Sequence, residues 1–150
     1  MKYIKKIINN SRKKNLYYNF LKLKFNSKIF DCHIDKPIEI GENSFISKSV
    51  LKKYFICGKY CEITQTKIGS FCSFGNNVCT NAGTHPISWL GTHLFIVNKK
   101  AYNWYRRHKY QNKKKLNFIW KKIVKIGNDA WIGNNVVILT GLKIGGTEPL

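Results

Sequence analysis

The sequence predicts one all-β domain, a parallel β-helix of short strands, because a six-residue repeat runs through it and Gly or Asn recurs at the repeat boundaries. The chain has 150 residues, enough for a single domain, and 43% of them are hydrophobic, enough for a folded core. Neither a helix nor a sandwich explains the spacing, since a helix repeats apolar residues every three or four positions and a sandwich alternates every two.

Two blocks carry the repeat most clearly. In both, a head residue stands at every sixth position, and a small or apolar residue follows it four positions later, as Cys72 follows Ile68. The heads are Ile68, Phe74, Thr80, Ile126, Ile132, Ile138 and Ile144. An inward-pointing head suits a chain that turns a corner every few residues, because Gly or Asn near the corner tolerates positive φ. We therefore expect the five large heads from Ile68 to Ile138 to face the interior.

The units before Ile68 are rougher. Ile40 and Ile46 head two of them, but a four-residue slip precedes the next head at Ile56, and the unit that starts at Glu62 is poor. Terminal repeats commonly act as caps, so we expect these coils to be less regular than the later ones. The predicted boundary lies before Ile40, with residues 1–39 as a basic N-terminal segment or cap and residues 40–150 as the β-helix domain.

A stretch without the repeat, about residues 86–125, separates the two blocks. Pro86 ends the preceding strand, because proline cannot donate a backbone hydrogen bond to a neighbouring strand. Loops longer than ~12–15 residues in a compact domain are usually functional or disordered, and the many aromatic residues of this stretch argue against simple disorder. The sequence therefore predicts a long extruded loop that begins directly after His85.

The segments NAGTHPISWLGTH at 81–93 and IGNDAWIGNNVVILTGLKIG at 126–145 resemble the hexapeptide-repeat acyltransferases, within them the xenobiotic and sugar O-acetyltransferase branch. The resemblance covers about residues 40–144. It implies a left-handed parallel β-helix, acetyl-CoA as co-substrate, and a homotrimer in which the acceptor and CoA meet in a cleft between neighbouring coils. Members of the family continue through further coils beyond the position of Ile144, so we interpret this domain as truncated at its C-terminus.

The function expected from this resemblance is acetyl transfer from acetyl-CoA to a small hydroxyl acceptor. A sugar of a surface polysaccharide or of its precursor is the acceptor that we expect. Two alternatives stay open. One is an antibiotic (xenobiotic) acetyltransferase, and the other is an inactive truncated relative that acts only as a basic binding protein.

His85 is the candidate catalytic residue. A hydroxyl is a poor nucleophile until a base takes its proton, and histidine has a pKa near neutrality that suits this task. The thioester of acetyl-CoA is already activated, so direct transfer in a ternary complex needs no covalent enzyme intermediate. The resemblance implies the same general-base role for His85. A loop histidine that merely caps a turn is the alternative, and His93 resembles a structural or interface position.

The remaining site candidates flank these segments. For CoA binding, we assign an aromatic residue near the expected pantetheine arm, two glycines that would let a thin ligand approach the backbone, and a lysine for a phosphate. These residues are Trp131, Gly133, Gly141 and Lys143. Asn81 and Trp89, on either side of His85, are the candidates for contact with the acceptor. Trp131 as an exposed corner aromatic, and the glycines as plain corner residues, are the structural alternatives.

The charge is strongly positive. There are 27 Lys and Arg against 7 Asp and Glu, a formal net charge of +20, which attracts phosphates, anionic lipid or nucleic acid. A coding bias toward Lys, Asn and Ile is an alternative cause. Between Lys99 and Lys122, basic residues alternate with Tyr and Trp, but no recognised RNA-binding signature accompanies them, so we expect no specific nucleic acid. The segment from Lys2 to Lys28 could form a basic amphipathic helix on an anionic membrane or pack as a cap.

Five cysteines form an odd set without a secretory signal before them, so we expect reduced, mostly buried thiols. Cys57 and Cys61 could be half of a zinc site, but no matching pair follows, and a β-helix metal site of three histidines has only His85 available. We therefore expect no metal. No apolar run approaches the ~20 residues of a membrane span, so we expect a cytoplasmic protein that could touch the membrane surface peripherally.

Overall fold

A computed structural model describes residues 1–9, 16–18, 20–85, 87, 91–92 and 122–145. The chain divides into two compact units, Met1–Ala82 with Lys121–Leu150, and Gly83–Trp120. Strands, turns and bends make up the described residues, which include no helix, and hence none that could cross a membrane. The first unit is a solenoid of short parallel strands stacked coil upon coil, and this confirms the predicted all-β parallel β-helix.

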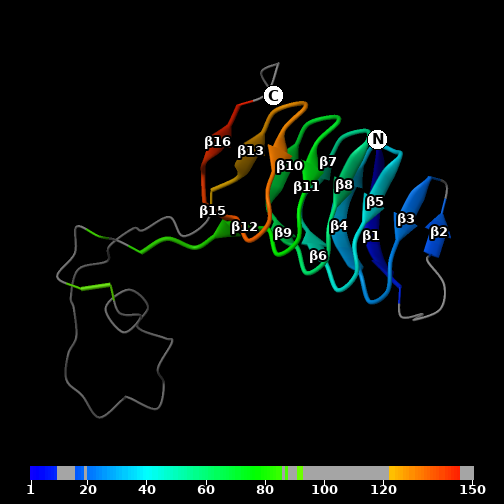
Figure 1. Cartoon of the computed structure of the whole chain (residues 1–150), viewed down its shortest axis with the longest axis horizontal. Coiled ribbons are helices and arrows are strands. Elements are labelled where there is room, and N and C mark those ends of the chain that lie inside the picture. Colours follow the sequence, from blue (N-terminus) through cyan, green and yellow to red (C-terminus); the bar gives the residue numbers. More distant parts are fainter. Residues whose placement is uncertain (10–15, 19, 86, 88–90, 93–121, 146–150) are drawn as a thin grey trace, which may run out of the picture. The chain divides into compact units, whose positions relative to one another are not determined.

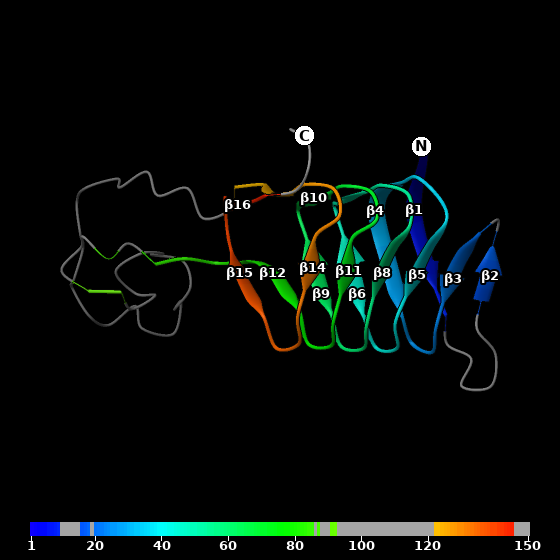
Figure 2. The ribbon, with the colours of Figure 1, turned by 45° about the horizontal axis from the view of Figure 1, so that its top comes forward.

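Each coil of the solenoid crosses three flat faces in turn (Figures 1 and 2). The first face contains β3 (Leu21–Leu23), β5 (Ile38–Ile40), β8 (Phe55–Cys57), β11 (Ser73–Phe74) and β14 (Trp131–Ile132). The second contains the first half of β4 (Lys28–Ile34), then β6 (Phe45–Ser47), β9 (Glu62–Thr64), β12 (Cys79–Ala82) and β15 (Val137–Leu139). The third contains the second half of β4, then β7 (Val50–Leu51), β10 (Thr66–Ile68), β13 (Val124–Ile126) and β16 (Lys143–Ile144).

The predicted inward residues line the core. Ile68 and Ile126 are completely buried, and Phe74, Ile132 and Ile138 are at most 9% exposed. Apolar burial of this kind contributes about 25 cal/mol for each Å² removed from water, so the stacked heads are the main source of cohesion between coils.

The early coils are regular but one residue shorter than we expected. Their buried heads advance by six, six and five residues, and side-chain hydrogen bonds between coils join residues 17 positions apart, such as Asn26 and Asn43. The heads are Leu23, Ile29, Ile34, Ile40, Ile46, Leu51, Cys57, Ile63 and Ile68. Thus the expectation of irregular early coils was wrong. Ile56, which we took as a head, is 42% exposed on the outside of β8, and Cys57 is the head.

Small donors at the corners satisfy backbone carbonyls of the next coil. Ser44 donates from Oγ to the carbonyl of Gly58 at 3.1 Å, and the Cys72 thiol donates to the carbonyl of Gly127 at 3.1 Å. Glycine is required where coils approach most closely, because a Cβ on Gly41 would overlap the carbonyl of Gly58 in the coil above. Buried polar groups are costly unless they are paired, so these corners favour Ser, Cys, Thr and Gly.

The N-terminal segment is extended where the structure describes it, so of the two alternatives, helix or packed cap, the helix is wrong for these residues. β1 (Lys2–Ile8) runs antiparallel to β4, and β2 (Leu16–Tyr18) runs antiparallel to β3. The physical reason is that the first coil presents unpaired strand edges, which a β-rich segment can cover. Parallel pairing already begins with β3 and β5, so the described coils start before Ile40.

The revised head positions predict different costs for two isoleucines that are seven positions apart in sequence. Ile63→Ala should lower the free energy of unfolding by about 2–5 kcal/mol, because Ile63 is a fully buried head. Ile56→Ala should change it by less than about 1 kcal/mol, because Ile56 lies on the outer surface. Urea unfolding of the two variants measures the difference, and equal costs would contradict the 17-residue coil.

Candidate functional site

The insertion leaves the solenoid at one particular corner, between the second and third faces. Earlier coils turn this corner in the five-residue step, each with a left-handed residue: Asp31, Lys48 or Gln65, with φ of 53°, 48° and 44°. In the next coil, β12 ends at Ala82 after a register shift between Thr80 and Ala82, and the chain returns to the solenoid at Lys122. The insertion therefore replaces a single tight turn.

Thr140 forms hydrogen bonds with both ends of the insertion. Its backbone N–H donates to the carbonyl of Ala82 at 3.0 Å, and its hydroxyl donates to the carbonyl of Lys122 at 3.0 Å. The backbone N–H of Lys122 donates in turn to the Thr140 hydroxyl at 2.5 Å. Gly141 follows with φ of 77°, and a Cβ there would lie 3.1 Å from that of Lys122. One short segment of the next coil thus fixes where the insertion starts and ends.

A buried network of hydroxyl groups lies beneath the two ends of the insertion. The hydroxyl oxygens of Thr66 and Thr80 are 2.6 Å apart, and the Thr80 oxygen also accepts the backbone N–H of Thr64 at 3.2 Å. Ser49 accepts the N–H of Thr66 at 3.1 Å. Sites that are built on rigid elements with locked side chains are more precise than sites on free loops. β12 is such an element, and the His85 segment follows it directly.

Asn81 is the candidate acceptor contact whose surroundings are best defined. It is 3% exposed with φ of 60°, and its amide donates to Gln65 Oε1 at 3.0 Å. Its Oδ1 is buried without a hydrogen-bond partner in the described part of the chain. The side chain is thus part of the corner, and contact of Asn81 with an acceptor stays a prediction.

His85 follows β12 by three residues and is exposed. Its Nδ1 lies 2.8 Å from the carbonyl oxygen of Thr92. A carbonyl can only accept, so Nδ1 carries the proton, and the lone pair of a neutral imidazole is then on Nε2. This tautomer is the one that lets Nε2 act as a general base. Thr92 could not be identified from the sequence, since a backbone carbonyl leaves no signal in the residue type.

The CoA candidates are distributed around the last described coil. Trp131 is 81% exposed on the first face, and Gly133 lies at the following corner with nothing within 4 Å of a Cβ built on it. Gly141 contacts Lys122 at the base of the insertion, and Lys143 is exposed on the third face. The solenoid therefore brings these residues to one coil but not to one face. Trp89 and His93 lie outside the described residues.

Other features of the described residues do not form an alternative centre. A shallow hollow lined by Ser70, Phe71, Asn128 and Asp129 contains none of the predicted site residues. No group of three or more His, Cys, Asp or Glu in the described ranges could hold a metal ion. All five thiols are free, and burial raises the pKa of Cys32 to about 11, so at neutral pH it is protonated.

Comparison with known proteins gives one informative relative. The chain is 27% identical over 139 residues to a chloramphenicol acetyltransferase of Escherichia coli, and the match covers 85% of this chain and 62% of that protein. The chain thus spans less than two thirds of the length of its relative. No family model matches, and no solved structure matches. The similarity and the parallel solenoid agree with a hexapeptide-repeat acetyltransferase.

The hydrogen bonds between Thr140 and Lys122 predict that the Thr140 hydroxyl stabilises the point where the insertion rejoins the solenoid. Thr140→Val keeps the side-chain shape but removes both hydrogen bonds to Lys122, which should lower stability by about 1–2 kcal/mol. Amide exchange at Lys122 should become faster, and Thr140→Ser should restore both properties. Hydrogen exchange by mass spectrometry and urea unfolding provide the readouts. Unchanged exchange at Lys122 in the valine variant would contradict this role of the hydroxyl.

Proposed function

We propose that the protein is an acetyl-CoA-dependent O-acetyltransferase that acts on a small hydroxyl acceptor. The observation that carries the proposal is the match to a chloramphenicol acetyltransferase over 85% of this chain. The hydrogen bond from His85 Nδ1 to Thr92 supports the choice of base, because it fixes the tautomer that a general base needs.

The proposed reaction is a direct transfer. His85 Nε2 takes the proton of the acceptor hydroxyl while the hydroxyl oxygen attacks the thioester carbonyl, and a tetrahedral oxyanion forms. The C–S bond then breaks, the imidazolium returns its proton to the leaving thiolate, and the products are an acetyl ester and free CoA. The Thr92 carbonyl stabilises the imidazolium through the Nδ1 proton during this step. No metal takes part in this proposal.

The acceptor that we propose is a sugar hydroxyl of a surface polysaccharide or its precursor. The second candidate is an antibiotic, because the relative is by name an acetyltransferase of chloramphenicol. A panel of both acceptor classes, with release of the CoA thiol as the readout, separates the two. Absence of release with every acceptor would favour the third alternative, an inactive relative that serves as a basic binding protein.

Acetyl-CoA would contact the last described coil through Trp131, Gly133, Gly141 and Lys143. Asn81 and Trp89 would contact the acceptor. We place the protein in the cytoplasm, where acetyl-CoA is available, with peripheral contact to anionic membrane as an option that its net charge of +20 supports.

Assembly is a separate part of the proposal. We expect a closed homotrimer, since flat-sided prisms suit cyclic symmetry and the resemblance implies that the acceptor and CoA meet in a cleft between neighbouring coils. Sedimentation equilibrium should give a mass three times that of the 17.5 kDa chain. A stable monomer with full transfer activity would contradict this expectation, whereas a monomer without activity would support the inactive alternative.

The role of His85 has a direct test. His85→Ala should lower kcat by about 10²–10⁴-fold with folding unchanged, because the acceptor loses its base. His33→Ala is a matched control, since His33 is an exposed histidine of β4 in the solenoid and lies outside the proposed site. His93→Ala should also have much less effect than His85→Ala. Near-normal transfer by the His85 variant would remove His85 from the mechanism.

A further inference from the structure

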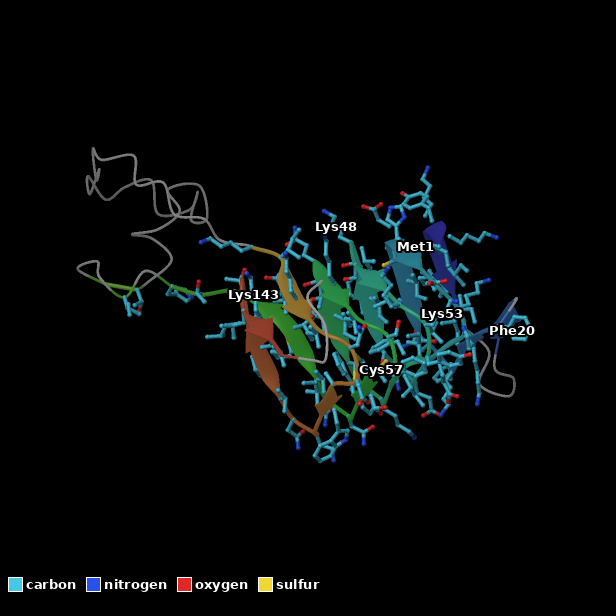
Figure 3. The ribbon with its side chains drawn as sticks, turned by 90° about the horizontal axis from the view of Figure 1, so that it is seen from above. Met1, Phe20, Lys48, Lys53, Cys57 and Lys143 are labelled. Atoms are coloured by element: carbon cyan, nitrogen blue, oxygen red, sulfur yellow. The ribbon has the colours of Figure 1, made fainter. Side chains whose placement is uncertain are left out.

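Three lysines form a ladder on the third face of the solenoid. Lys67 of β10 pairs in register with Lys125 of β13, and Lys125 pairs with Lys143 of β16. The residues on either side of Lys67 and Lys125 are buried, so both lysines point outward, and Lys143 is exposed on the next strand of the same face (Figure 3). We call these three residues the lysine ladder.

Repulsion among the three positive charges of the ladder lowers the stability of the sheet. Neighbouring strands lie about 4.8 Å apart, and like charges directly opposite each other destabilise a sheet. No ion pair joins any of the three lysines within the described part of the chain. An arrangement that costs stability and has no counter-charges among the described residues points to counter-charges from a ligand.

On the first face, in contrast, lysines form ion pairs with a carboxylate on the neighbouring strand. Lys22 of β3 stands opposite Glu39 of β5, with Nζ 3.1 Å from the carboxylate, and Lys24 reaches the same carboxylate at 2.8 Å. On the third face, the outward positions of the described strands contain no carboxylate at all. They are His33, Val50, Lys67, Lys125 and Lys143.

The shape of the ladder selects the kind of ligand. Sites for small molecules are concave, whereas these lysines stand on a flat sheet, and the described hollow lies at the following corner beside Asp129. Sites for single-stranded nucleic acid use aromatic side chains for stacking, and amphipathic segments that insert into a membrane surface add apolar side chains to their basic ones. The outward positions of β10, β13 and β16 offer only lysine. A linear polymer with regularly spaced anionic groups fits this line of charges.

We propose that the lysine ladder binds a linear acidic polysaccharide, with the polymer lying along the solenoid axis across β10, β13 and β16. Lysine supports this role because its ammonium is a compact point charge that pairs with carboxylates and sulfates without a fixed geometry. The choice of a carbohydrate polymer rests on the proposed sugar acceptor. The ladder would then hold the acidic polymer that carries the acceptor hydroxyl.

The test compares two triple variants of equal charge. The first, Lys67→Gln with Lys125→Gln and Lys143→Gln, neutralises the ladder. The control neutralises Lys5, Lys48 and Lys53, which are exposed lysines outside the ladder. Figure 3 labels the last two of them together with Lys143. Binding to fluorescently labelled polygalacturonate and heparin is measured by anisotropy over a series of salt concentrations, without acetyl-CoA, with neutral dextran as the blank.

The ladder variant should bind both acidic polymers at least about tenfold more weakly, and its slope of log affinity against log salt should fall by about 2–3. The control variant should lose less than about threefold. Equal losses in the two variants would show that only the net charge matters and would overturn the proposal. Loss of binding to a single-stranded oligonucleotide or to phosphatidylserine vesicles, with polysaccharide binding retained, would overturn it as well.

Two further measurements keep the outcomes separate. The ladder variant should unfold at the same or a higher urea concentration than the parent chain, because the repulsion is removed, so a loss of binding cannot be assigned to misfolding. Acetyl transfer to a monomeric sugar by the parent chain tests the proposed function without the polymer; the ladder variant is not used here because Lys143 is also a proposed CoA contact. Failure of transfer there counts against the proposed reaction, while the polymer-binding result still decides the ladder.

Discussion

The stacking of inward heads is the constraint on which the rest of the structure depends. Each head must lie over the head of the coil below, so the backbone has to return to the same face after a fixed length. In the early coils this length is 17 residues, with the shorter step at the corner between the second and third faces. Across the insertion, side-chain bonds such as that of Ser70 with Asn128 join residues 58 positions apart, and the stacking still continues.

This continuity explains how a long insertion can interrupt a coil without breaking the stack of the solenoid. The strands on both sides keep their partners, as β10 pairs with β13 and β12 with β15. The hydroxyls of Thr66 and Thr80 brace the corner from inside, and Thr140 closes it from the next coil.

The sequence predicted the later coils well because their heads are large and the six-residue spacing is uninterrupted. It failed on the early coils because two signals were weak: a five-residue step looks like a slip, and a thiol at Cys57 is a less obvious head than the neighbouring Ile56. The N-terminal strand was missed because a short segment rich in Ile and Lys fits a helix or a strand, and only the open edge of β4 decides between them. His85 could be chosen from its motif, but the carbonyl of Thr92 leaves no signal in the residue type, and the hydrogen bonds of Thr140 join positions whose proximity depends on the coil geometry.

The closeness of Ala82 and Lys122 has a consequence for how this protein can change. Because both ends of the insertion are held by one residue, the free energy of closing that loop depends only weakly on its length, about 0.6 kcal/mol for each doubling. Loops of different length and composition could therefore be exchanged at this corner while the solenoid stays the same. The composition of the insertion and the stability of the fold would then be separable properties, open to independent selection or to deliberate grafting.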